Sequence, residues 1–413
     1  MKILLVCEHF HPLGGGVSKT LVEYGARLHQ FGHEISVATS YTSQRTSDEY
    51  LGMKIYSFKV SGNAVSGMTG EVGDYQQFLK SGNFDCLFVV AAQQWTLDAM
   101  LPILDSIPYK KYHMPCGYSS FYLPAFRDYY RDMGLLLSKF QALIYNSSNY
   151  RDINYARELG LKNIHIIPAA ASELEFEQRP APTTKKQLQI KQDEFVFLTV
   201  GAPAYHKGQK EAVQAYLKAK LPFPSVLVAN GDYELAAETW VQVLKKMTSL
   251  RKIRSVAKEL AQRFLGISPA NIYQIAKRNR DPNKRVLFTN LDRPALISLF
   301  FEANLFLFPS HVEYSPLVIF ESMAANLPFL SVPAGNVDEI VEWSHGGFLC
   351  TDVRKKNGRT YVNVASFTSM LEEIAKNPAK LKTAGDNGRR AWQQRFTWQI
   401  TSRQLEAVMK ANQ

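Results

Sequence analysis

The chain alternates short apolar runs with segments whose apolar residues recur at helical spacing. Lys2–Cys7 is an apolar run of strand length, and a segment with one apolar face follows it and ends near Gly32. The same pattern predicts further strands at Ile35–Thr39, Ile55–Val60, Cys86–Val90, Tyr109–His113, Leu143–Tyr145 and Ile164–Ile167. This rhythm of strands and helices predicts an α/β domain with a parallel, doubly wound sheet.

The rhythm stops at a polar, proline-bearing stretch, residues 177–186, and then starts again. The second series predicts strands at Phe195–Val200, Val226–Ala229, Val286–Thr289, Leu305–Phe308, Phe329–Val332 and Phe348–Cys350. The chain therefore reads as two Rossmann-like domains, residues 1–178 and 190–390, that face a cleft. A long helical segment at about 234–285 is larger than a crossover needs and reads as an insertion.

Composition agrees with large folded domains. With 413 residues, of which 46% are hydrophobic, the chain is long enough for two or three cores. The N-terminal apolar run is interrupted too early for a secretory signal, and no apolar stretch is long enough to span a bilayer. The four cysteines are scattered, so neither a disulfide framework nor a metal site is expected. A cytoplasmic location is predicted.

The net charge of +11 is concentrated in the predicted insertion. Between Arg251 and Arg285 lie only two acidic residues and ten basic ones, the basic ones being Arg251, Lys252, Arg254, Lys258, Arg263, Lys277, Arg278, Arg280, Lys284 and Arg285. Such a patch suggests an anionic partner, for example the inner face of the cytoplasmic membrane. A solvated helical face is an equally good interpretation. No zinc-finger or RNA-binding signature is present, so nucleic acid is not an expected partner.

Two glutamates eight positions apart, Glu313 and Glu321, are the most informative candidates for chemistry. Glu313 follows a predicted strand, and Glu321 lies in a helix predicted to start near Pro316. Ligands of open α/β sheets bind at the carboxyl ends of strands, where both carboxylates could accept from sugar or ribose hydroxyls. The alternative is a chance pair of solvated surface residues.

Four further residues are candidates for binding an anionic ligand or a sugar. Gly15 and Gly16 open the first predicted helix and would let a phosphate approach its N-terminus, unless they form only a flexible loop. Lys207 follows the first strand of the second domain and could hold a diphosphate, or it is an ordinary surface lysine. His113 ends a predicted strand and could donate to a sugar hydroxyl, although a lone histidine is often structural.

Several familiar chemistries are not indicated. The glycine run lacks the spacing of a P-loop or a dinucleotide fingerprint, and no Asp-x-Asp, HExxH, GxSxG or kinase motif appears. A metal-independent electrostatic mechanism without a cofactor is therefore expected.

The motifs together resemble those of a known enzyme family. The segment from Glu313 to Ala324 resembles the E-x7-E motif of retaining GT-B glycosyltransferases of the large family four, the group 1 glycosyl transferases. Residues 336–341 and 346–349 resemble the next block of that family, and the glycine loop resembles its N-terminal loop. Residues 395–398 resemble the start of its final helix, which would make 391–413 a helix that crosses back to the first domain.

The resemblance implies an activity, a division of roles and partners. It implies transfer of a hexosyl unit from a nucleotide-diphosphate sugar to a glycan or lipid-linked acceptor, as in polysaccharide, lipopolysaccharide or capsule biosynthesis. The first domain would take the acceptor, around residues 61–73 and 118–130, and the second the donor. The catalytic residues would be Glu313, Lys207 and His113. The donor would also contact Gly15, Gly16, Glu321, Ser315, Pro316 and Leu317.

One departure from the family pattern concerns charge. Ala202 stands where the family has an arginine for the diphosphate, and Arg293 or His206 is a candidate replacement. This departure keeps open the alternative of a non-catalytic scaffold subunit of a glycan-assembly complex. The alternative enzyme is an epimerase or hydrolase of nucleotide sugars on the same fold.

Overall fold

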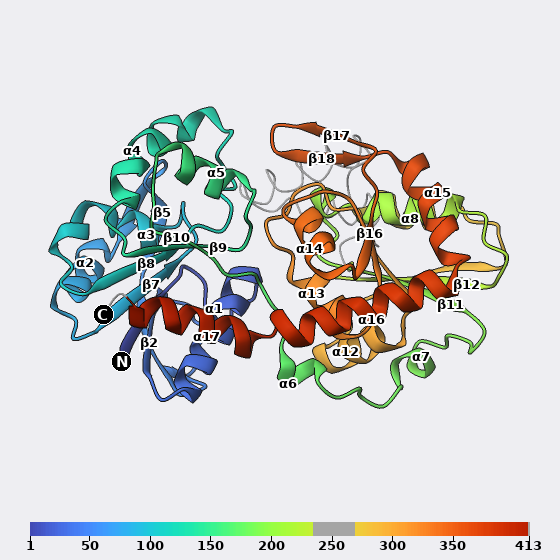
Figure 1. The fold of residues 1–413 in the computed structure, drawn as a ribbon, viewed down its shortest axis with the longest axis horizontal. Helices are drawn as coiled ribbons and strands as arrows, with labels where there is room; N and C mark the ends of the chain where they lie inside the picture. The colour runs from blue at the N-terminus through green and yellow to red at the C-terminus, as the bar shows by residue number, and fades with distance from the viewer. Residues whose placement is uncertain (234–268, 412–413) are drawn as a thin grey trace, which may run out of the picture. The chain divides into compact units, whose positions relative to one another are not determined.

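The computed structural model describes residues 1–233 and 269–411, which form two compact units. The first unit contains Met1–Ser172, Tyr314–Leu317 and Arg395–Gln413, and the second contains Glu173–Glu313 and Val318–Gln394. Each unit is built around its own sheet (Figure 1).

The first unit holds an eight-stranded sheet of order β10-β9-β8-β7-β1-β2-β4-β3, parallel except for its edge strand β3. The strands are β1 (Lys2–Val6), β2 (Glu34–Ser40), β3 (Glu49–Tyr50), β4 (Met53–Phe58), β7 (Cys86–Val90), β8 (Lys110–Met114), β9 (Ala142–Tyr145) and β10 (Ile164–Ile166). This arrangement confirms the predicted doubly wound sheet. The strand predicted at Ile55–Val60 is wrong at its end, because Val60 instead pairs with Gly70 in a separate hairpin, β5 (Val60–Asn63) with β6 (Gly67–Gly70).

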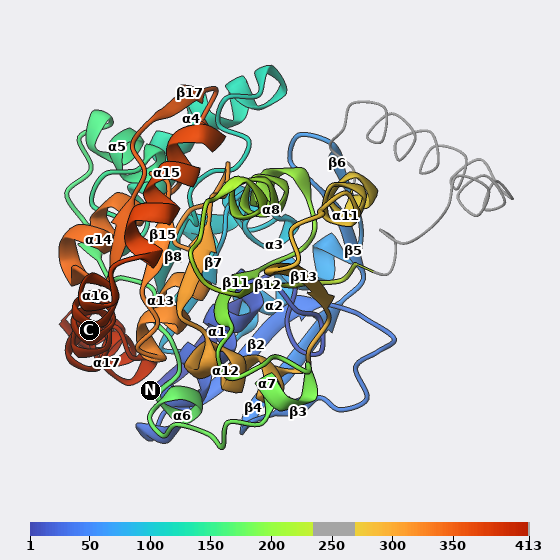
Figure 2. The ribbon, with the colours of Figure 1, turned by 90° about the vertical axis from the view of Figure 1, so that its right-hand side faces the viewer.

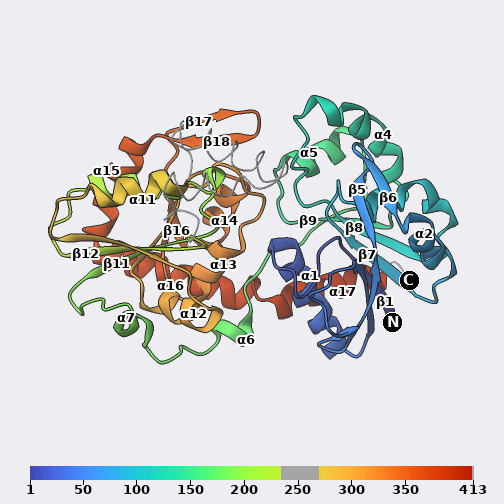
Figure 3. The same cartoon turned by 180° about the vertical axis from the view of Figure 1, so that it is seen from behind.

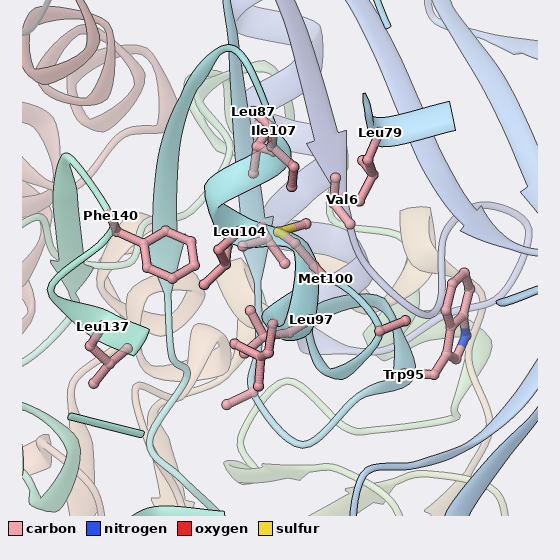
Figure 4. Close-up of a cluster of buried hydrophobic side chains, with 14 of the residues drawn as sticks. Val6, Leu79, Leu87, Trp95, Leu97, Met100, Leu104, Ile107, Leu137 and Phe140 are labelled. Atoms are coloured by element: carbon pink, nitrogen blue, oxygen red, sulfur yellow. The ribbon is translucent and has the colours of Figure 1, made fainter. Parts of the chain in front are cut away.

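Helices cover both faces of this sheet because its strands are apolar on both sides. Ile3 and Leu5 face a cluster with α1 (Gly16–Gln30) and α17 (Trp398–Ala411), which lie side by side (Figure 1). Leu4 and Val6 face the opposite cluster, part of which is drawn in Figure 4. That side carries α2 (Val72–Ser81), α3 (Trp95–Asp98), α4 (Arg127–Leu137), α5 (Arg151–Glu158) and the short helices η1 (Leu101–Ser106) and η2 (Pro124–Phe126). A strand buried on both faces explains the unbroken apolar runs in the sequence.

The second unit holds a six-stranded, fully parallel sheet of order β13-β12-β11-β14-β15-β16. Its strands are β11 (Phe195–Val200), β12 (Ser225–Asn230), β13 (Lys284–Thr289), β14 (Leu305–Phe308), β15 (Phe329–Ser331) and β16 (Gly347–Leu349), close to the predicted runs. A two-stranded hairpin, β17 (Val353–Lys356) with β18 (Arg359–Val362), stands outside the sheet (Figure 3).

The helices of the second unit are α6 (Glu173–Phe176), α7 (Thr184–Gln187), α8 (Gln209–Lys218), α11 (Pro269–Lys277), α12 (Arg293–Glu302), α13 (Leu317–Ala324), α14 (Val337–Ser344), α15 (Val364–Ala375) and α16 (Pro378–Arg395), with the short helix η3 (Tyr205–Lys207). Helices α8 and α11 lie side by side (Figure 2), and with α15 they pack on one apolar face of the sheet. The proline-bearing stretch 177–186 is held to this unit, since the backbone N–H groups of Thr184 and Lys185 donate to Glu302.

The predicted basic insertion is only partly described. Arg251, Lys252, Arg254, Lys258 and Arg263 lie outside the described residues. Lys284 is buried at the start of β13 and donates to the carbonyl of Leu217 at 3.0 Å, and Arg285 pairs with Glu194. These two cations therefore serve the fold of the second unit rather than a solvated patch.

Helix α17 ties the C-terminal end of the described chain to the first unit. Trp398 is fully buried, and its ring meets Tyr24 of α1 edge-on at 5.2 Å. Replacement of Trp398 by Ala should lower the free energy of unfolding by about 3–5 kcal/mol, because a large buried side chain is lost. Urea denaturation followed by circular dichroism measures this loss.

Leu174 provides the control, since it is 72% exposed. Leu174→Ala should change the free energy of unfolding by less than about 0.5 kcal/mol. Equal effects of the two substitutions would contradict a structural role for α17.

Candidate functional site

The switch point of the second sheet brings two predicted site residues together. The chain runs outward from β11 through β12 to β13 and then returns to β14 on the other side of β11. The loops after β11 and β14 therefore leave the same edge of the sheet in opposite directions, which is where open α/β sheets bind ligands. Lys207 lies in the first loop and Glu313 in the second.

The two loops are bonded to each other. The backbone N–H of His311 donates to the carbonyl of His206 at 2.8 Å, and the hydroxyl of Ser310 donates to the same carbonyl at 3.0 Å. Gly208 has a φ of +68°, and a Cβ there would lie 1.8 Å from the carbonyl oxygen of Pro309. Only glycine allows this close approach, so Gly208 determines the position of the neighbouring Lys207.

Lys207 and Glu313 form an ion pair at this point. The Nζ of Lys207 lies 2.9 Å from Oε1 of Glu313, and the same oxygen accepts from Ser310 Oγ at 2.7 Å. The Glu313 side chain is 9% exposed and that of Lys207 is 31% exposed. The ammonium group is therefore accessible, while the carboxylate is held in a fixed position beneath it.

Glu321 lies inside α13, as predicted, and belongs to a second ion-pair group. Arg293, the first residue of α12, donates to Glu321 at 2.7 Å and to both carboxylate oxygens of Glu175. Burial acts to lower the pKa of Arg293, but its bonds to Glu175 and the charge of Glu321 raise it overall. Arg293 is thus balanced by two carboxylates, which argues against the hypothesis that it replaces the cation missing at Ala202.

His206 is the other candidate replacement named from the sequence. Burial and the charge of Lys207 lower its pKa, and the nearby Arg359 acts in the same direction. Its imidazole is therefore neutral at neutral pH and contributes no full positive charge. Arg359 could not be predicted as a neighbour of His206, because it lies about 150 positions away in the hairpin β17–β18.

The residues between the two motif glutamates are anchored to the first unit. Tyr314–Leu317 group with that unit, and the hydroxyl of Tyr314 accepts from the backbone N–H of Asn146 at 2.9 Å. The same hydroxyl is bonded to the carboxyl group of Asp152. Pro316 is buried, and Ser315 has a buried hydroxyl without a hydrogen-bond partner among the described residues.

Gly15 and Gly16 lie at the corresponding switch point of the first sheet, between β1 and β7. Gly15 precedes α1 with a φ of +131°, and α1 begins at Gly16 without a side-chain cap or an acidic residue in its first turn. No described atom lies within 4 Å of where a Cβ would stand at either glycine. Uncapped N–H groups at a helix start favour an anion.

His113 is placed differently from the prediction. Its imidazole is fully buried within β8, where Nδ1 donates to the carbonyl of Val89 at 3.0 Å. Burial lowers its pKa to about 4, although the bond to Val89 opposes this effect. The ring is a neutral core group, and no described contact supports a bond to a sugar hydroxyl.

Loops at the carboxyl ends of β7 and β8 contain a feature that sequence reasoning missed. Three consecutive residues, Cys116, Gly117 and Tyr118, have positive φ values of 58°, 84° and 46°. Non-glycine residues in this region carry backbone strain, which is often found at functional sites. Only Gly117 could have indicated a positive φ from the sequence, because the φ values of Cys116 and Tyr118 depend on tertiary contacts.

A cavity of about 370 Å³ opens beside these loops in the first unit. It is lined by Phe121, Tyr122, Leu123, Pro124, Arg127, Tyr130, Arg131, Tyr155 and Leu159. The hydroxyl of Tyr130 is buried there without a hydrogen-bond partner in the described part of the chain. Aromatic rings with an unused hydroxyl suit a sugar ring. Of the two exposed arginines, Arg131 pairs with Asp128 and Asp132, so the positive charge at the cavity comes from Arg127.

The described part of the chain has neither a metal-binding cluster nor a membrane-spanning helix. Within residues 1–233 and 269–411, no three His, Cys, Asp or Glu side chains come together as a set that could hold a metal ion. Metal independence stays a prediction, since it concerns the reaction. None of the described helices has both the length and the apolar character needed to cross a bilayer.

Comparison with known proteins gives a family match over part of the chain and a fold over nearly all of it. Residues 224–357 match the family described as Glycosyl transferases group 1, a range that includes Glu313, Glu321 and Arg293. A search of curated proteins finds no match.

Solved structures similar to this chain cover almost all of it. A sucrose-phosphate synthase from Thermosynechococcus elongatus has a TM-score of 0.72 at 17% identity, covering 99% of this chain and 98% of its own. Anabaena HepE in complex with UDP-glucose has a TM-score of 0.68 at 17% identity, with full coverage of both chains. WaaG, a glycosyltransferase involved in lipopolysaccharide biosynthesis, has a TM-score of 0.63 at 14% identity over 98% and 99% of the chains. The predicted GT-B fold is confirmed.

Asp152, which holds Tyr314, gives a prediction for stability against pH. Burial raises its pKa from 3.8 to about 6, although bonds from Tyr314, Ile153 and Gly117 oppose the shift. Between these values the folded protein keeps a proton that the unfolded chain has lost, so stability from this group falls as pH rises. Relative to Asp152→Asn, the free energy of unfolding of the wild type should fall by about 2–3 kcal/mol from pH 4 to pH 7.

Urea denaturation of both proteins at several pH values measures this difference. Asp128→Asn is the matched control, because Asp128 is an exposed carboxylate of the same unit with 78% of its side chain accessible. A difference between wild type and Asp152→Asn that stays constant with pH would contradict the assigned titration.

Proposed function

We propose that the chain transfers a hexosyl unit from a nucleoside-diphosphate sugar to an acceptor hydroxyl with retained anomeric configuration, because residues 224–357 match the family described as Glycosyl transferases group 1. The observation that carries this proposal is the Lys207–Glu313 pair at the switch point of the second sheet. It places an accessible cation and a fixed carboxylate where a nucleotide sugar would present a diphosphate and hydroxyl groups. HepE, which shares the fold, was solved with UDP-glucose, and this supports a uridine nucleotide as the first donor to test.

Lys207 would stabilise the leaving group. When the bond between the anomeric carbon and the phosphate oxygen breaks, its electron pair stays on the diphosphate, where negative charge develops. The ammonium group of Lys207 would bind those oxygens. In the structure Lys207 contacts Glu313, so a bound diphosphate would compete with that carboxylate for the cation.

The two glutamates would bind the donor at separate places. Glu313, held by Ser310, would accept from a hydroxyl of the transferred sugar, and Glu321, held by Arg293, from the ribose hydroxyls. Backbone N–H groups at Ser315 and Leu317 would help to hold the sugar and phosphates. Each carboxylate is positioned by a partner, so it is preorganised for hydrogen bonding.

Retention would follow from attack on the face that the leaving group departs from. The acceptor oxygen forms its bond to the anomeric carbon as the phosphate bond breaks, and the acceptor proton passes to the leaving phosphate oxygen. Atoms and charges balance without a covalent intermediate, so no protein nucleophile is needed. His113, buried in β8, has no part in this scheme.

The acceptor would bind the first unit at the cavity beside α4. This cavity lies partly on the loop 118–130 predicted to take the acceptor, and its Arg127 would suit an acidic or phosphate-bearing glycan. A lipid-linked acceptor would place the enzyme at the inner face of the cytoplasmic membrane, as a peripheral protein. Of the basic residues predicted to favour such contact, Lys277, Arg278 and Arg280 are described.

Substitution of the ion pair tests the proposed chemistry. Lys207→Ala and Glu313→Ala should each lower kcat by about a hundredfold or more, because one removes the cation at the leaving group and the other a sugar contact. The assay follows nucleotide release from a panel of nucleotide sugars with and without acceptors. Little release without acceptor distinguishes a transferase from a hydrolase or epimerase.

Lys218→Ala is the matched control, since Lys218 is an exposed lysine at the end of α8. Its kcat should stay within about twofold of the wild type. Circular dichroism establishes that the variants are folded. Full activity of both Lys207→Ala and Glu313→Ala would overturn the assignment, and absence of any donor turnover would favour the scaffold alternative.

Chelation tests metal independence. If side chains and backbone N–H groups balance the leaving-group charge, EDTA should leave the initial rate within about twofold of the untreated enzyme. The measurement is the transfer rate after EDTA treatment, with and without added Mg²⁺ or Mn²⁺. Loss of activity that either ion restores would show that a metal belongs to the mechanism.

A further inference from the structure

The hairpin β17–β18 is an unusually cationic element of the second unit. It carries Arg354, Lys355, Lys356 and Arg359 and no acidic residue. Its turn, Asn357-Gly358, has positive φ at both positions, which is typical of a tight two-residue hairpin. The family match ends at residue 357, so β18 lies beyond it.

The register of the hairpin separates its cations into two faces. Arg354 pairs with Tyr361 and Lys356 with Arg359, while Lys355 pairs with Thr360. Side chains alternate along a strand and paired residues share a face, so Arg354, Lys356, Arg359 and Tyr361 lie on one side. Lys355 and Thr360 lie on the other.

The hairpin is fixed against the loop that carries Glu313. The backbone N–H of Thr360 donates to the carbonyl of His311 at 2.8 Å, and its buried hydroxyl donates to Pro333 at 3.1 Å. The ring of Tyr361 lies 5.4 Å from that of His311, whose other neighbour is Tyr205 at 4.9 Å. The face that contains Arg359 is therefore directed toward the loops of Lys207 and Glu313.

The electrostatics around these loops agree with this placement. Arg359 is exposed and makes no ion pair with any described residue, whereas Arg354 lies over the Tyr361 ring at 5.0 Å. The charge of Arg359 lowers the pKa of His206, although burial and the charge of Lys207 have larger effects. Glu313 is the acidic group that acts on His206, against the two cations Lys207 and Arg359, so positive charge is in excess around His206.

We propose that Arg359, on the Tyr361 face of the hairpin, binds the diphosphate of the donor and supplies the positive charge that Ala202 does not. The inference rests on the proposed function. It follows from geometry, because Thr360 of the hairpin donates to the carbonyl of His311, two residues before Glu313. It also follows from elimination, because Arg293 is paired with two carboxylates. An arginine suits this role, since its planar group can donate two parallel bonds to a phosphate.

Calorimetry tests the proposal. A panel of nucleoside diphosphates, beginning with UDP, first identifies the base that binds, and the variants are then titrated with that diphosphate and with the matching nucleoside. Arg359→Ala should weaken binding of the nucleoside diphosphate by about tenfold or more, because a charged hydrogen bond is lost. Binding of the matching nucleoside, which has no phosphate, should not change. Arg359→Lys should retain part of the affinity.

Lys355→Ala is the matched control, because it removes one charge from the same hairpin on the opposite face. It should weaken binding by less than about twofold. Equal losses for the two alanine variants would show a general field rather than a contact and would overturn the inference, as would an unchanged affinity of Arg359→Ala. If the wild type binds no nucleoside diphosphate, the proposed function itself fails.

Discussion

The contact between Lys207 and Glu313 depends on the order of strands in the second sheet. Because β14 returns to the side of β11, the loops after these strands leave the sheet edge next to each other. Gly208 lets the first loop approach the carbonyl of Pro309 closely, and Ser310 bonds both His206 and Glu313. The ion pair is thus the outcome of the sheet topology, and it fixes the two groups that the proposed chemistry needs most.

The charges of the second unit divide into structural and accessible ones. Lys284 and Arg285 satisfy carbonyls and Glu194 within the fold, and Arg293 neutralises Glu175 and Glu321. Lys207, in the loop after β11, and Arg359, the first residue of β18, are more accessible. A counted net charge does not distinguish these groups, because burial and pairing decide which cations remain available to a ligand.

Local pattern was sufficient to predict most of the strands and the place of both motif glutamates. Parallel strands buried on two faces produce apolar runs that are visible in the sequence, and Glu313 directly follows such a run. The pattern failed at Val60, where pairing with Gly70 in a hairpin breaks the predicted strand. It also could not show that His113 faces the core, since a residue at a strand end has the same local sequence whether buried or exposed.

The partners of the site residues were beyond the reach of sequence reasoning. Glu175 and Arg293 are 118 positions apart, and His311 and Thr360 are 49 apart, so only the folded chain brings them together. Family resemblance pointed to a missing charge at Ala202 but not to its replacement. Such contacts depend on tertiary structure rather than on local spacing.

A crystal structure with the nucleoside diphosphate that binds tests the central claim most directly. The account predicts a phosphate oxygen at about 3 Å from Nζ of Lys207, with the ion pair to Glu313 broken or shared. A diphosphate bound elsewhere, with Lys207 still held by Glu313 alone, would contradict it.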